Sequence, residues 1–251
     1  MTIKEVFPNP TVKKVIFQIK FPNLFYIEDK IGDFQIRIMD QFPKSSLVFE
    51  KQFLFALGIN ASLADAEQEK LKKGDRKIWQ FKNDENVQVN LYADSLSITS
   101  ESHKTYSNTA SENRFRDIIE YVVGNLIDIV NIPVILRIGF RYLDEFPLME
   151  KNNENYLNHF NSAFNLERFD ISEAGIMEIK TNLSRGKYFF NYGEKVLKKD
   201  EQWTVFLDFD AFANNIKAED FLTVTDELHD INVDEFKKVI KEPVYEYMRK
   251  K

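Results

Sequence analysis

The clearest alternation of apolar and polar residues lies in the stretch 134–144, VILRIGFRYLD. Side chains in a β-strand point alternately to opposite faces, so this stretch reads as a strand with two unlike faces. One face carries Arg137 and Arg141 on either side of Gly139, with Ile135 and Leu143 beyond them. The other is apolar or aromatic throughout and should lie on the core: Val134, Leu136, Ile138, Phe140 and Tyr142. We therefore predict a core strand whose outer face holds two guanidinium groups beside the open space left by a glycine.

The same reading predicts the other elements. Further strands are expected at 15–21, 47–57, 77–81, 87–99 (with a turn at 93–95), 175–183, 187–192 and 203–210. Helices are expected at 27–41, 115–129, 156–164 and from 219 onward, with a last helical piece after Pro243. The polar run 60–76 reads as a surface loop with a short helix at most.

Composition favours long elements joined by short loops, because the chain has 23 Phe but only 8 Gly and 7 Pro. Phenylalanine buries a large area and has no polar group. We therefore predict an α+β fold of mainly antiparallel sheets covered by helices. The Asn- and Glu-rich stretch 150–155 is the best boundary candidate, giving halves 1–149 and 150–251 that pack together as one globular unit.

The two halves share an order of elements. A helix, three strands and a helix are expected from about residue 27 to 130 and again from about 153 to 240. The spacing of Val89, Leu91, Asp94 and Leu96 also matches that of Val205, Leu207, Asp210 and Phe212. A tandem duplication explains both observations, and a chance match over so few positions is the alternative. Duplicated halves would leave a groove near the strand 134–144.

Several classes of chemistry are excluded or disfavoured by composition. The chain has no Cys, which excludes disulfides, thiolate nucleophiles and Cys-ligated metals. Its three histidines show no zinc-binding spacing, and His229 is expected on the surface or at a helix cap. A net charge of −6 argues against a general nucleic-acid binder. Without a signal-peptide pattern or a membrane-spanning run, a cytoplasmic protein is expected, with no cofactor and no membrane partner.

Arg137 and Arg141 are the first candidate site. Two guanidinium groups on one strand face would bind a phosphate or carboxylate, with Tyr142 and Asp144 contributing at the strand end. Trp79 would form core or the wall of the same groove. The alternative, which we favour, is that both arginines form ion pairs with acidic helix faces.

Asp208 and Asp210 are the second candidate site. Two carboxylates two residues apart on a strand point to the same face, as in enzymes that hold two divalent ions. No Gly-rich phosphate loop and no third carboxylate strand accompany them. A strand-end aspartate that stabilises a turn, like Asp94 in the matching stretch, is therefore the favoured explanation.

The chain resembles a family of uncharacterised prokaryotic proteins of similar length, which are sporadically distributed and named only by a serial number. The resemblance lies in VIFQIKFP (15–22), in 79–81 and in the segment IGFRY (138–142), which is its most specific part, and continues through 207–210 and 228–229. That family usually has Asn where this chain has Asp144. It implies no established activity, but its patchy distribution is typical of genes that move with defence or toxin–antitoxin systems.

These observations favour a non-enzymatic binding or regulatory protein that recognises a protein partner or an anionic ligand near the strand 134–144. The resemblance implies a partner encoded by a neighbouring gene. The alternative is a metal-dependent enzyme that acts on phosphodiesters or nucleotides through Asp208 and Asp210. A third hypothesis is an oligomer of identical chains that pair through Phe-rich sheet edges.

Overall fold

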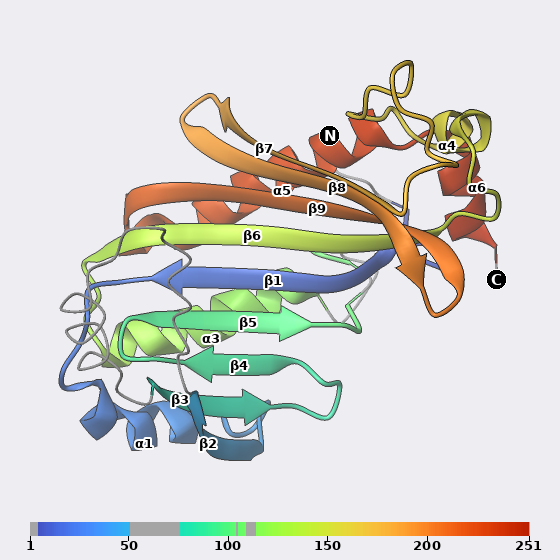
Figure 1. Cartoon of the computed structure of the whole chain (residues 1–251). Coiled ribbons are helices and arrows are strands. Elements are labelled where there is room, and N and C mark those ends of the chain that lie inside the picture. Colours follow the sequence, from blue (N-terminus) through green and yellow to red (C-terminus); the bar gives the residue numbers. More distant parts are fainter. Residues whose placement is uncertain (1–4, 51–75, 104, 109–113, 251) are drawn as a thin grey trace, which may run out of the picture.

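A single nine-stranded sheet forms the centre of the fold (Figure 1). In this computed structural model, residues 5–50, 76–103, 105–108 and 114–250 are described. Each strand is antiparallel to its neighbours, in the order β2-β3-β4-β5-β1-β6-β9-β8-β7, which confirms the predicted antiparallel α+β class. The strands are β1 Val12–Lys20, β2 Lys44–Glu50, β3 Arg76–Lys82, β4 Gln88–Leu91, β5 Ser95–Ser100, β6 Val134–Pro147, β7 Ile176–Arg185, β8 Tyr188–Lys199 and β9 Gln202–Lys217.

Helices cover one face of the sheet, which we call the inner face. They are α1 Ile27–Ile38, α3 Phe115–Ile129, α4 Asn153–His159, α5 Phe221–Val239 and α6 Glu242–Arg249, and a 3₁₀ turn (Ala218–Asp220) leads into α5. Figure 1 shows α3 and α5 behind the sheet, with α5 following β6 and β9, and α1 beside β2 and β3. Phe34 of α1 meets Phe81 of β3 edge to face, with ring centres 5.6 Å apart. The sheet and these helices therefore enclose the core as two layers.

The predicted alternation of β6 is confirmed in its middle and is wrong at its start. Ile138 and Phe140 are fully buried on the inner face. Ahead of them Ile135 is buried, whereas Val134 and Leu136 are exposed, so the strand changes face near Leu136. The regular pairing with β9 skips the position opposite Leu136, where Asn215 has a left-handed backbone (φ 55°). Asparagine tolerates that conformation, which interrupts the pleat.

The predicted tandem duplication is not confirmed. Among the described residues, four strands, β2 to β5, lie between α1 and α3, whereas three, β7 to β9, lie between α4 and α5. The matching stretches also differ, because 89–96 forms two strands around a turn and 205–212 lies inside the unbroken β9. The predicted halves meet where β6 pairs with β9 along nearly its whole length. Of the predicted strand 47–57 and loop 60–76, residues 51–75 lie outside the described residues.

A buried carboxylate fixes the short helix α4 to the sheet. Glu194 of β8 is 1% exposed and accepts hydrogen bonds from the hydroxyls of Ser162 (2.8 Å) and Tyr192 (2.9 Å). The backbone N–H of Ala163 donates to the same carboxylate at 2.9 Å, and the Tyr156 hydroxyl of α4 donates as well. Four donors compensate for the removal of this charge from water. Glu194 is therefore part of the scaffold.

Candidate functional site

A cavity of about 470 Å³ lies on the inner face, between β6 and α5. Its wall is completed by residues 103 and 105–108, by the N-terminal segment 5–12 and by Met248 of α6. Much of that wall is apolar and includes Phe7, Val15, Phe115, Phe209 and Phe236. The cavity has the size and the largely apolar lining of a small-molecule site.

Three polar atoms on this wall have no hydrogen-bond partner. They are Oδ2 of Asp144, Nε2 of His229 and Oδ1 of Asn232, and within the described part of the chain no other buried side-chain nitrogen or oxygen is unpaired. All three residues line the one cavity. Nearly all buried polar groups in proteins are paired, so a group of unpaired atoms needs an explanation. These three atoms are fully buried and have lost their hydration without gaining a partner within the protein.

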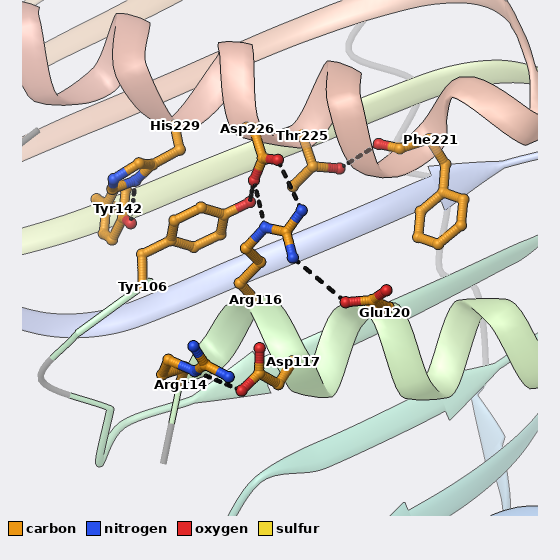
Figure 2. Close-up of polar contacts among 10 residues, drawn as sticks. All are labelled: Tyr106, Arg114, Arg116, Asp117, Glu120, Tyr142, Phe221, Thr225, Asp226 and His229. Carbon is orange, nitrogen blue, oxygen red and sulfur yellow. Dashed lines mark hydrogen bonds and ion pairs between the residues drawn. The ribbon is translucent and has the colours of Figure 1, made fainter. Parts of the chain in front are cut away.

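His229 and Asn232 are held in place by β6. They lie three residues apart on α5, so both point to the same side of the helix. Nδ1 of His229 is 2.8 Å from the Tyr142 hydroxyl, a contact visible in Figure 2. Nδ2 of Asn232 donates to the carbonyl oxygen of Phe140 at 2.7 Å. Because each side chain uses one polar atom on β6, its other polar atom is the one left without a partner.

The imidazole of His229 is neutral at physiological pH. Burial lowers its pKa to about 4, although the nearby Asp226 acts in the opposite direction. The ring of Tyr106 stacks on it, with centres 4.1 Å apart. Among the described residues, Nδ1 is the only hydrogen-bond partner of the Tyr142 hydroxyl. We assign the hydroxyl as the donor, which makes Nδ1 the acceptor and leaves the ring proton on Nε2.

Asp144 reaches the cavity from β6, near the end of β1. The Thr11 hydroxyl donates to its Oδ1 at 2.7 Å, which leaves Oδ2 free. Burial raises the pKa of this carboxyl to about 7, and the Thr11 hydrogen bond only partly opposes that shift. Asp144 therefore changes its charge near neutral pH.

Asp226 of α5 holds the cavity wall together (Figure 2). Its carboxylate accepts the Tyr106 hydroxyl at 2.6 Å and two N–H groups of Arg116 at 2.8 and 2.9 Å. Burial and this hydrogen bond raise the pKa of Tyr106, which therefore remains a donor. The contacts join the segment 103–108 and α3 to α5, and they keep the Tyr106 ring on His229.

We expect Asp226→Ala to lower the free energy of unfolding by about 2 kcal/mol, because a buried tyrosine hydroxyl and a bidentate arginine lose their acceptor. Urea denaturation measures the change. Glu120→Ala is the matched control, because Glu120 bonds the same Arg116 at 3.3 Å but is 56% exposed. The control should change stability by less than about 0.5 kcal/mol. Equal effects of the two substitutions would contradict this role of Asp226.

The predicted arginine and aspartate sites lie together on the outer face, away from the cavity. Arg141 donates to both oxygens of Asp208, at 2.7 and 2.5 Å. Arg137 donates to Asp210 at 3.2 Å, and Asn191 donates to the same carboxylate at 2.9 Å. The two candidate sites are therefore one ion-paired cluster. The favoured ion pairs are present, but their acidic partners come from the neighbouring strand β9 instead of from helices.

Two expectations about this cluster need correction. The space beside Gly139 is not open, since a Cβ atom there would lie 2.7 Å from Nη1 of Arg137. Asp208 and Asp210 are not strand-end residues, because they lie inside β9. Across the residues that the structure describes, no three His, Asp or Glu side chains are placed to hold a metal. Anion binding by the arginines and metal binding by the aspartates stay predictions.

The other predicted site residues are divided between two places. Tyr142 and Asp144 are at the cavity, as part of its wall. Trp79 of β3 lies apart from it, beside a separate hollow lined by Arg76 and Asp94. The prediction that His229 is a surface or capping residue is wrong, since it is 7% exposed and faces the cavity.

Sequence reasoning missed Asn232, Thr11 and Tyr106 as members of the site. One signal was present, because His229 and Asn232 fall on the same helical stripe as the buried Val224, Leu228 and Val239. Polar residues on an apolar stripe are the informative exceptions to the burial pattern.

A scan against models of known protein families finds no match, and a search of curated proteins finds none. The resemblance to the sporadically distributed prokaryotic family therefore stays a prediction. None of the described helices has the length and apolar character needed to cross a membrane.

Proposed function

We propose that this chain is a binding protein that holds a small organic ligand in the cavity between β6 and α5. The observation that carries the proposal is the cavity of about 470 Å³, whose largely apolar wall includes three polar residues, Asp144, His229 and Asn232. A concave, largely apolar site with a few polar groups is typical of small-molecule binding. The apolar wall would take the body of the ligand.

Recognition explains these residues better than catalysis does. A general base works best when its pKa lies near the working pH, whereas burial lowers the pKa of His229 to about 4. Within the described residues, the hydrogen bond to its Nδ1 comes from Tyr142 and not from a carboxylate. A rigid neutral donor suits the orientation of a ligand.

Other parts of the proposal rest on composition and on the family resemblance. They are a protein partner encoded by a neighbouring gene, a role in defence and a cytoplasmic location. Ligand binding on the inner face leaves the outer face with Arg137 and Arg141 for such a partner. No specific observation favours the metal-dependent enzyme.

The test is equilibrium dialysis of the purified protein against a small-molecule extract of its own cells, read by mass spectrometry. We expect one compound to be enriched by the wild-type protein and about tenfold less by His229→Phe, which keeps the ring but removes both nitrogens. His159→Phe is the matched control, because His159 bonds Asn155 outside the cavity. If no compound depends on His229 while all three proteins are folded, the proposal is wrong.

A further inference from the structure

The free edge of β7 offers a surface for a second copy of this chain. We propose that two copies pair β7 with β7 in antiparallel orientation, so that their sheets join into one sheet across a two-fold axis. This inference is independent of the proposed ligand site. It rests on the open edge of the strand and on the spacing of the charges along it.

β7 is the last strand of the sheet and is open along one side (Figure 1). Its ten residues pair with β8, and no backbone hydrogen bond joins them to any other described residue. Because a strand can pair on both sides, half of its N–H and C=O groups are left for solvent or for another strand. An added strand from a second chain would satisfy these groups.

The outer face of β7 carries one acidic and one basic side chain, two positions apart. Nζ of Lys180 lies 2.7 Å from the carboxylate of Glu178, and the Lys180 side chain is 76% exposed. Nζ of Lys195 on β8 lies 3.5 Å from the same carboxylate. Lysines alone on an edge strand repel a second copy, whereas an acid and a base on one face can be self-complementary.

This spacing selects one register of pairing. Residues opposite each other in an antiparallel pair point to the same face, so the two-fold axis of a symmetric pair passes through a residue. With the axis at Ile179, Glu178 of each copy lies opposite Lys180 of the other. An axis at Glu178 or at Lys180 would instead set that charge against itself. No other axis on β7 brings the two groups together.

The inner face of the same register is largely apolar. Ile179 would meet its own copy at the axis, and Met177 would lie opposite Thr181. All three side chains are half-buried in the single chain, so contact across the axis would remove the rest of their surface from water. Residues 176–182 of each strand would pair. Because this interface is small, we expect a dimer with a dissociation constant in the micromolar range.

Charge exchange tests this register. The mass of the full chain is measured by light scattering during size-exclusion chromatography, with the protein loaded at about 100 µM. Glu178→Lys and Lys180→Glu each place like charges in both cross-strand pairs, so each should raise the dissociation constant at least about tenfold. An equimolar mixture of the two variants restores opposite charges and should form a dimer again.

Lys217→Glu is the matched control and should leave the dimer unchanged. Lys217 lies on β9, is 74% exposed and pairs with Glu219 two positions away, as Lys180 pairs with Glu178. It therefore reports the effect of the same charge change away from the edge.

A dimer that each variant loses and their mixture restores would support the inference. A wild-type chain that stays monomeric would overturn it, and so would a mixture of the variants that stays monomeric. A dimer that both variants retain would overturn pairing through β7. Assemblies larger than a dimer would also overturn it, because pairing of β7 with the opposite edge strand β2 builds an open series of copies instead of a closed pair.

Discussion

Replacing Glu194 with alanine is expected to lower the free energy of unfolding by about 4 kcal/mol, the largest loss of stability among the substitutions considered. The carboxylate is 1% exposed and accepts from Tyr156, Ser162 and Tyr192 as well as from the amide of Ala163. Its removal leaves four donors unpaired and opens a cavity beside α4. Urea denaturation followed by circular dichroism measures the change.

The control for Glu194 is Glu219→Ala, because Glu219 is 73% exposed and pairs with Lys217 in solvent. That substitution should change stability by less than about 0.5 kcal/mol. Glu194→Gln keeps the size but turns an N–H group toward the donors, so it should fall between the two. If Glu194→Ala lowers the free energy of unfolding no more than the surface control does, the buried network contributes nothing to stability. This account of how α4 is fixed to the sheet would then be wrong.

Asp144→Asn is expected to stabilise the protein, and the gain should grow with pH. Burial raises the pKa of Asp144 from its ordinary value of 3.8 to about 7, so the folded state binds its proton more tightly than the unfolded state. The contribution of Asp144 is fully present below about pH 4 and is lost as the pH rises through 7. At about 1.4 kcal/mol per pKa unit, the loss at pH 8 is roughly 4 kcal/mol.

Asparagine does not titrate and can still accept the hydrogen bond from Thr11. The variant should therefore match the wild type near pH 4 and exceed it most at pH 8. The comparison is made by urea denaturation of both proteins at each pH, so that the titration of His229 cancels. Parallel stability curves would show that Asp144 is not a buried, destabilised carboxylate.

Local pattern was enough to predict most of the elements. The alternation in β6 and the apolar stripe of α3 each depend on one segment, and the structure contains both. The hairpin of β7 and β8 around Gly186, whose φ is 62°, is likewise set by a few consecutive residues. The start of β6 was mispredicted because the face to which its side chains point depends on the backbone of Asn215. That residue lies opposite Leu136 in the sheet but 79 positions after it in the chain.

The site could be predicted only in part, because it depends on which segments become neighbours. The sequence shows Arg137, Arg141, Asp208 and Asp210 as two separate pairs, and only the β6–β9 register brings them together. Likewise, His229 reads as a surface residue until α5 packs on Tyr142. Tyr142 and Asp144 could be predicted because they lie on the strand with the clearest alternation of apolar and polar residues.

The most direct test of the ligand site is the ¹⁵N NMR spectrum of the His229 imidazole, followed as the compound enriched in the dialysis experiment is added. The chain has three histidines, and His229→Phe identifies the resonances. We predict a neutral ring protonated on Nε2 at about pH 6.5, because burial lowers its pKa to about 4. We also predict that the ring resonances move on saturation with that compound. A charged ring, a proton on Nδ1, or ring signals that the compound does not move would contradict the account.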